Sequence, residues 1–283
     1  MEQNRLYGKN LIKSVNMTSE VQQKYESFAN DIAARVSKIE GVTLVTLMGS
    51  VAAGVADEYS DIDLLAFYTT EPSTETIHAV LNSENSQTKA EKFWLDADKF
   101  SMQLSIDGIS AAVVFMKQSW YEERLAEYSN IKLEEYKQLA FCVSDARFIV
   151  GNKELYESWK ARIGTMPADL KKMTLTGNVA MLRNFFVQKR ILPNEKRADW
   201  LFINSLFAKA VDCALEVVFI LNNSVYASPK LARRKLSKME IKPLNLIERL
   251  EDVSIGENTE KSLQHRMEVM AGITQELEVM TRT

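Results

Sequence analysis

Apolar residues recur at steps of three or four along residues 19–39, the spacing that places side chains on one face of a helix. The apolar positions are Val21, Tyr25, Phe28, Ile32, Val36 and Ile39. Ser19 followed by Gln22 resembles a capping box at the start of this segment, and Gly41 ends it. The pattern therefore predicts an amphipathic helix over residues 19–39.

Shorter apolar segments follow and predict strands. VTLVTLMGS (42–50) is rich in β-branched residues and closes on a glycine, and DIDLLAFY (61–68) has the same character. In KFSMQLSIDGISAAVVFM (99–116), apolar and polar residues alternate up to Asp107-Gly108, a strong turn signal, so we expect a hairpin. We expect helices around this small sheet at 75–82 and 119–138.

The pattern changes from about residue 153 onward. Five segments with helical apolar stripes follow, and we expect breaks at Pro167, Pro193, Pro229, Pro243 and Gly256. No β-rich segment and no fixed-period repeat interrupts them, which is typical of a helical bundle. The expected fold class is α+β: a small mixed sheet flanked by helices in a domain over residues 1–145, then an all-α helical bundle domain over 146–283.

Composition narrows the classes of partner. The chain has 283 residues, 46% of them hydrophobic, and a formal net charge of −3, so it carries no chain-wide basic field. Nucleic acid is therefore an unlikely partner. The stretch 200–222 is the most hydrophobic of the second half, but Lys209, Asp212 and Glu216 interrupt it, so we expect no membrane span.

The two cysteines, Cys142 and Cys213, are far apart and lie in no metal-binding or redox motif. We interpret both as small apolar residues, which favours a reducing compartment. The first residues lack the apolar segment of a signal peptide. We therefore expect a cytoplasmic protein.

Two aspartates one residue apart begin the second predicted strand. Because residues i and i+2 of a strand point to the same face, Asp61 and Asp63 are expected to project together, with Ile62 and Leu64 turned into the core. Like charges placed so close repel, so a cation is expected between them. A hard divalent ion such as Mg²⁺, or Mn²⁺ in its place, takes carboxylate oxygens and keeps positions for phosphate oxygens.

A Gly-Ser pair closes the preceding strand. Gly49 has no side chain, so its backbone can approach a phosphate closely. The Ser50 hydroxyl and nearby backbone N–H groups can then hold phosphate oxygens. A phosphate cradle opposite carboxylates that bind a metal is typical of phosphoryl or nucleotidyl transfer.

The stretch GSVAAGVADEYSDIDL (49–64) resembles the signature of the nucleotidyltransferase superfamily, in the branch of the minimal and antibiotic-modifying enzymes. The matching positions are Gly49, Ser50, Gly54, Asp61 and Asp63. The resemblance implies a nucleotide site at the glycines and the serine, and Mg²⁺ and catalysis at the aspartates. It also implies attack of an acceptor on the α-phosphate of a nucleoside triphosphate, ATP being the expected one, with a helical domain closing the cleft.

The superfamily pattern adds a third carboxylate on a later strand, where this chain has Ala112, next to Ala111. Alanine can neither bind a metal nor activate an acceptor. Asp107 is the nearest acid, but it occupies the predicted turn. A base could instead come from other acidic residues, for which the sequence offers Glu122, Glu123, Asp145 and Asp199.

A basic stretch, KLARRKL (230–236), offers Lys230 and Arg234 as a lining for a triphosphate or an acidic acceptor; a solvated helix face is the alternative. LNNSVYASPKLARRKL, which contains it, resembles a helical segment seen in bacterial proteins of this type.

The hypothesis that unites these observations is a Mg²⁺-dependent nucleotidyltransferase that modifies a hydroxyl of a small, antibiotic-like molecule. Two alternatives stay open. One is a catalytically impaired module that binds nucleotide or a protein, and the other is a protein-directed enzyme of the toxin–antitoxin type.

Overall fold

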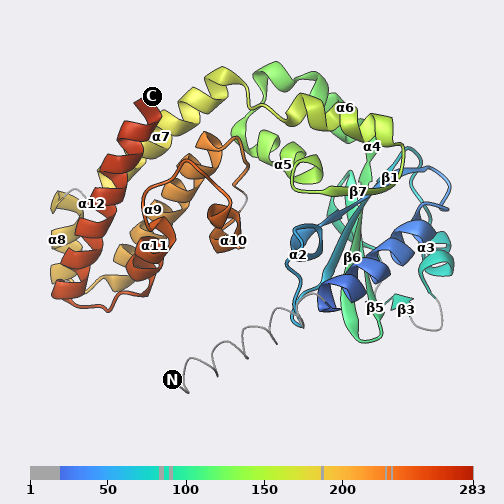
Figure 1. Ribbon diagram of the computed structural model, residues 1–283, viewed down its shortest axis with the longest axis horizontal. Coiled ribbons are helices and arrows are strands. Elements are labelled where there is room, and N and C mark those ends of the chain that lie inside the picture. The colour runs from blue at the N-terminus through green and yellow to red at the C-terminus, as the bar shows by residue number, and fades with distance from the viewer. Residues whose placement is uncertain are drawn as a thin grey trace, which may run out of the picture. The chain divides into compact units, whose positions relative to one another are not determined.

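The computed structural model describes residues 20–82, 86–88, 92–185, 188–226, 228–230 and 232–282. The chain divides into two compact units (Figure 1). The first comprises Met1–Ile131 with Gln138–Gly164, and the second comprises Lys132–Lys137 with Thr165–Thr283. The sequence placed the division at 145–146. In the structure β7 (Arg147–Gly151), which follows that point, pairs with β1 (Val42–Met48) and lies in the first unit.

The first unit is built on a seven-stranded mixed sheet, which confirms the predicted α+β class. Its strand order is β3-β5-β6-β2-β1-β7, and β4 also pairs with β5. Only β2 and β6 run parallel among these pairs. The remaining strands are β2 (Ile62–Tyr68), β3 (Ser86–Thr88), β4 (Phe93–Asp96), β5 (Lys99–Ile106) and β6 (Ile109–Lys117).

Helices cover both faces of this sheet. On one face, the predicted first helix, observed at 20–36, packs its apolar stripe against the strands in a shared core with α2 (Gly49–Ala52) and α3 (Thr74–Leu81). On the other face, Phe67 contacts Tyr121 of α4 (Gln118–Ala126) and Trp159 of α6 (Lys153–Ile163), with ring centroids 5.4 and 4.9 Å away. The burial of aromatic residues on this second face stabilises the sheet from both sides.

Two element predictions differ from the structure. The helix expected at 119–138 is interrupted: α4 ends at Ala126, a single 3₁₀ turn occupies Tyr128–Asn130, and α5 (Leu133–Val143) follows. The break expected at Pro193 does not occur, because α8 (Gln188–Lys196) runs through that proline. The short strands β3, β4 and β7 were not predicted, since they are three to five residues long and carry little periodic signal.

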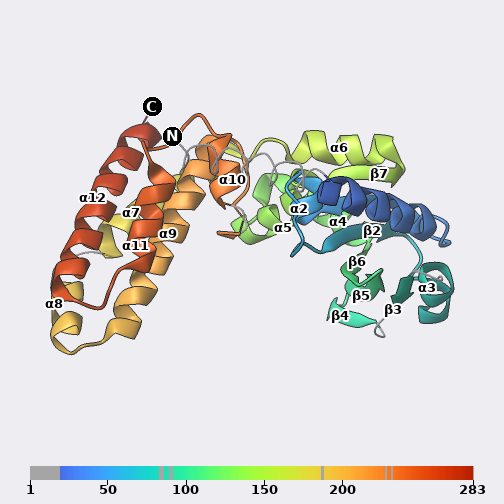
Figure 2. The same ribbon diagram turned by 60° about the horizontal axis from the view of Figure 1, so that its bottom comes forward.

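The second unit is helical, as the apolar stripes predicted. Its remaining helices are α7 (Ala168–Phe185), α9 (Trp200–Leu221), α10 (Ala232–Ser237), α11 (Leu246–Ile255) and α12 (Glu260–Arg282). In both views α7, α9, α11 and α12 lie side by side, and they bury one continuous core (Figure 2). None of the described helices is long and apolar enough to cross a membrane.

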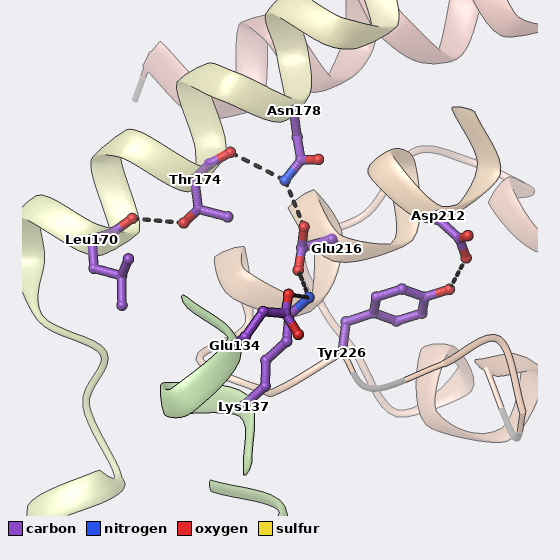
Figure 3. Close-up of polar contacts among 8 residues, drawn as sticks. All are labelled: Glu134, Lys137, Leu170, Thr174, Asn178, Asp212, Glu216 and Tyr226. Atoms are coloured by element: carbon purple, nitrogen blue, oxygen red, sulfur yellow. Dashed lines mark hydrogen bonds and ion pairs between the residues drawn. The ribbon is translucent and has the colours of Figure 1, made fainter. Parts of the chain in front are cut away.

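A buried carboxylate lies inside this unit (Figure 3). Glu216 of α9 accepts a hydrogen bond from Asn178 Nδ2 at 2.8 Å and forms an ion pair with Lys137 Nζ at 2.5 Å. The Glu216 side chain is 12% exposed and that of Lys137 21%. The ion pair therefore ties the segment Lys132–Lys137 to the helical unit. Nearby, Tyr226 donates a hydrogen bond to Asp212, and burial, followed by that bond, raises the pKa of the phenol.

We expect Lys137→Met to lower the free energy of unfolding of the helical unit by about 3 kcal/mol, because it leaves a buried carboxylate without its cation. Glu134, which lies 3.6 Å from the same ammonium but is 80% exposed, supplies the control. Glu134→Gln is expected to change the free energy by less than about 0.5 kcal/mol. Urea unfolding of both variants checks this, and equal effects would contradict a buried role for the Lys137–Glu216 pair.

Candidate active site

The Gly-Ser turn begins where β1 ends. Met48 is the last residue of β1, and Gly49 opens the short helix α2 with a φ of +69°. A residue with a side chain rarely adopts this left-handed conformation, so glycine is required for the chain to turn here. Ser50 follows in α2 and is half-buried.

The two aspartates stand at the start of β2. Asp61 immediately precedes the strand and is exposed, while Asp63 is its second residue and is half-buried. Ile62 and Leu64 are fully buried in the core against helix 20–36. Because alternate strand residues point to opposite faces, Asp63 belongs to the other face, and Asp61 lies two residues before it.

Gly49 and Asp63 are direct neighbours. A β-carbon placed on Gly49 would lie 2.7 Å from Oδ2 of Asp63. The strand register explains this, since Met48 pairs with Asp63 across β1 and β2. The missing side chain of Gly49 thus makes room for the carboxylate, and the turn and the acid form one site.

A short segment connects the turn to the aspartates. Its first part is closed by backbone hydrogen bonds from Ala53 N to Gly49 O at 3.1 Å and from Val55 N to Ser50 O at 3.0 Å. Gly54, at its exposed tip, has a φ of +70°, and a β-carbon there would meet no heavy atom within 4 Å. Gly54 is therefore selected for its backbone conformation rather than for space.

The turn that leads into Asp61 is fixed by its own side chains. Asp57 Oδ1 accepts hydrogen bonds from Tyr59 N at 3.1 Å and from the Ser60 hydroxyl at 3.0 Å, and Ser60 Oγ accepts one from Asp57 N at 2.9 Å. The carboxylates of this turn also act on helix 20–36. Burial, and after it the charges of Asp57 and Glu58, raise the pKa of Tyr25.

Ala112 lies in register with Asp63. The parallel pairing of β2 and β6 places Asp63 beside Ala112, and the antiparallel pairing of β5 and β6 places Ala112 beside Gln103. Paired residues share a face, so Asp63, Ala112 and Gln103 form one row across three strands. The position of Ala112 is the one at which the resemblance to the superfamily leads us to expect a third acid. Across the described ranges, no three His, Cys, Asp or Glu side chains form a group able to hold a metal.

Three of the other candidate acids stabilise local structure. Asp107 and Gly108, with φ values of +45° and +82°, make the two-residue turn between β5 and β6, as predicted. Asp199 accepts a hydrogen bond from Phe202 N and caps α9 in the second unit. Glu122 accepts one from Gln118 on α4 at 2.8 Å.

Four other candidate residues lie outside the signature. Glu123 is exposed on α4, and Asp145 lies between α5 and β7. Lys230 and Arg234 are exposed residues of the second unit.

Sequence reasoning did not single out Gln22, although its side chain contacts the segment that joins the two halves of the site. It bonds to Val51 O and to Ala56 N at 2.9 and 2.8 Å. Its partners lie 29 and 34 residues away in the sequence, so no local pattern could have indicated this contact. From the sequence, Gln22 was recognised only as part of a capping box at the start of the first predicted helix.

The donor set fits a magnesium ion. Mg²⁺ in phosphoryl-transfer sites is held by one or two carboxylates and completes its octahedron with water and substrate phosphates. Asp61 and Asp63 supply such carboxylates, and that of Asp63 lies directly against the backbone of Gly49. All the donors are oxygens, as a hard cation requires.

The first unit thus combines a mixed sheet with a left-handed glycine turn that lies against the second acid of an Asp-x-Asp pair. Residues 29–144 match the family model described as nucleotidyltransferase domain. The predicted resemblance is thereby confirmed, and the match supports an enzyme of the nucleotidyltransferase class. No curated protein sequence matches the chain.

Solved structures show a weak likeness. A nucleotidyltransferase-like protein from Exiguobacterium sibiricum is 10% identical over 93% of this chain and 74% of its own, with a TM-score of 0.37. Spectinomycin adenyltransferase AAD(9) from Enterococcus faecialis is 11% identical over 94% and 99%, with a TM-score of 0.33. The Cid1 poly(U) polymerase is 19% identical over 41% and 39%, with a TM-score of 0.26. TM-scores this low carry no argument about function.

The contact between Gly49 and Asp63 predicts that Gly49→Ala disables the site. A left-handed alanine costs about 1–2 kcal/mol, and its β-carbon would also displace the Asp63 carboxylate. We expect pyrophosphate release to fall about 10²-fold, the effect of a misplacement of about 1 Å. Gly108→Ala is the matched control, because its φ is +82° but its β-carbon would meet nothing within 4 Å. Equal activity in the two variants would contradict the role of this contact.

Proposed function

We propose that the protein transfers a nucleoside monophosphate from a nucleoside triphosphate, with ATP as the first candidate, to a hydroxyl group of a small molecule. The observation that carries the proposal is the contact of Gly49 with the Asp63 carboxylate, two residues after Asp61. It supports a site that receives phosphates at the turn and a divalent ion at the acids. The match of residues 29–144 to the nucleotidyltransferase domain family supports the reaction type.

In the proposed reaction, the acceptor oxygen forms a bond to the α-phosphorus, and the bond between that phosphorus and the α–β bridging oxygen breaks. Pyrophosphate leaves with the bonding electron pair, and the acceptor proton passes to water or to a base. Asp61 and Asp63 would hold Mg²⁺ or Mn²⁺, which neutralises charge on the phosphate oxygens when bound. The backbone at Gly49 and Gly54 and the Ser50 hydroxyl would hold the phosphate chain.

A small acceptor is proposed over a nucleic acid because the chain has 35 basic and 38 acidic residues. Binding to a nucleic acid backbone requires several phosphate contacts from a concentrated basic surface. The free thiols of Cys142 and Cys213 support the accompanying proposal of a reducing, cytoplasmic location.

One observation favours a second candidate, a module that binds nucleotide with impaired catalysis. Ala112 occupies the position in register with Asp63 where an acid could act as base. Loss of a general base typically slows a reaction by about 10²–10⁴-fold. A slow transferase and a binding module therefore share the same site and differ in measurable turnover.

One assay separates these candidates. The protein is incubated with each of the four nucleoside triphosphates, Mg²⁺ and a panel of hydroxyl-bearing small molecules. Pyrophosphate release and the mass of each acceptor are then followed. We expect pyrophosphate together with an acceptor heavier by one nucleoside monophosphate. Thermal stabilisation by nucleotide without either product would support the binding module instead.

A further inference from the structure

The side-chain amide of Gln22 joins the two ends of residues 51–56, the connecting segment of the candidate site. Its Nε2 donates to Val51 O at 2.9 Å, and its Oε1 accepts from Ala56 N at 2.8 Å. Val51 and Ala56 are themselves fully buried, so both ends of the segment are anchored to helix 20–36. One side chain thus fixes the span of a segment whose tip, Gly54, is exposed.

Two further residues hold the amide in this orientation. Glu26, one helical turn further on, accepts a second hydrogen bond from Gln22 Nε2 at 2.9 Å. Arg147 of β7 forms an ion pair with the same Glu26 oxygen at 3.0 Å. Both Nε2 hydrogens therefore meet acceptors and Oε1 meets a donor, whereas a flipped amide would place like groups together at all three contacts. The orientation of Gln22 is fully determined by its partners.

The connecting segment follows the Gly49–Ser50 turn, while the pairing of Met48 with Asp63 holds Gly49 beside Asp63. Gly49 and Ser50 precede it, and Asp61 and Asp63 follow it after the Asp57–Ser60 turn. A change in its span would shift the backbone of residues 51–56, which is bonded to Gly49 and Ser50 through Ala53 and Val55. Gln22, Glu26 and Arg147 all lie outside residues 29–144, the part that matches the nucleotidyltransferase domain family.

We propose that Gln22 is a positioning residue: through Val51 and Ala56 it holds the backbone of residues 51–56, beside the phosphate-binding turn, in its working conformation, and Glu26 and Arg147 fix its amide. This inference rests on the proposed function, since it assigns a role within the same site. Gln22 acts through the backbone and contacts no reacting atom.

The two hydrogen bonds from Gln22 to the backbone of Val51 and Ala56 are tested without any reaction. Gln22→Ala removes both bonds, and we expect amide hydrogen exchange at Ala56 to rise about tenfold, the effect of losing one typical hydrogen bond. Gln23→Ala is the matched control, because Gln23 is the exposed neighbour on the same helix. Glu26→Gln keeps an acceptor for Nε2 but loses the charge, so its exchange should stay near the wild-type rate. Unchanged exchange at Ala56 in Gln22→Ala would overturn the inference.

The positioning role is tested by the affinity for ATP with Mg²⁺, measured by calorimetry, and by the kinetic constants. We expect Gln22→Ala to weaken ATP binding and to raise KM by about tenfold, because displaced phosphate-binding groups lower the affinity for the nucleotide and raise the KM. Gln23→Ala should change neither. Faster exchange at Ala56 with unchanged affinity and KM would show that Gln22 only stabilises the local structure, and this would overturn the proposal.

Failure of the proposed function looks different from failure of this inference. If the wild-type protein binds nucleotide but releases no pyrophosphate, transfer is refuted and the affinity comparison still decides the role of Gln22. If the wild-type protein binds no nucleotide, the proposed function fails. Faster exchange at Ala56 would then show only that Gln22 stabilises the local structure, and the positioning role would be overturned as well.

Discussion

Asp63→Asn is expected to reduce pyrophosphate release by about 10³-fold or more. Asparagine keeps the shape of the side chain but removes the charge that would hold the divalent ion. A metal ion contributes several kcal/mol of charge stabilisation in the transition state, and each 1.36 kcal/mol corresponds to about tenfold in rate. The half-buried carboxylate beside Gly49 is the group that this substitution changes.

The same variant should be no less stable than the wild-type protein when metal is absent, because it relieves the repulsion between Asp61 and Asp63. Asp31→Asn supplies a matched control: Asp31 is an exposed residue of helix 20–36, ion-paired with Arg35 at 2.9 Å. The loss of this exposed ion pair should alter the free energy of unfolding by less than about 1 kcal/mol and leave turnover unchanged. A folded Asp63→Asn protein with wild-type turnover would refute the metal role.

Ala112→Asp is expected to increase turnover by about 10²-fold, the lower bound for the contribution of a general base. The new carboxylate would lie in register with Asp63 on the neighbouring parallel strand and on the same face of the sheet. Ala112 is half-buried, so a side chain at this position remains accessible to a substrate. Initial rates of pyrophosphate release, measured with saturating nucleotide, check this.

Metal should also affect the stability of this variant. Three neighbouring carboxylates repel, so Ala112→Asp should melt lower than the wild-type protein in a chelator and recover when Mg²⁺ or Mn²⁺ is added. Ser110→Asp is the control, since Ser110 is exposed on the same strand two residues before Ala112 and adds the same charge. If Ala112→Asp improves neither turnover nor metal-dependent stability, Ala112 does not occupy the position of the third acid.

The central part of the site was predictable because it is local. Gly49 and Asp63 belong to one strand–turn–strand segment, and the alternation of a strand alone places Ile62 and Leu64 opposite the acids. The hairpin was predictable for the same reason, since Asp107-Gly108 is a turn signal that does not depend on the rest of the fold. The parallel pairing of β2 with β6, the second strand of this hairpin, places Ala112 in register with Asp63.

Features that depend on tertiary structure were not predictable. Gln22 meets its backbone partners across 29 and 34 residues, and a glutamine on a half-buried helix face has no distinctive pattern. The division of the chain at Gly164 depends on the pairing of β7 with β1, and β7 is a five-residue strand with little periodic signal. Pro193 was expected to end a helix, but α8 continues through it, so the local preference did not decide the structure.

The central claim is that a divalent ion held by Asp61 and Asp63 joins a nucleoside triphosphate to the Gly49 turn. The most direct measurement is calorimetric titration of ATP into the wild-type protein and into Asp63→Asn, each with Mg²⁺ and with a chelator. The account predicts that Mg²⁺ strengthens binding to the wild-type protein at least about tenfold, or about 1.4 kcal/mol, and that Asp63→Asn loses this gain. Equal ATP affinity in all four titrations would contradict it.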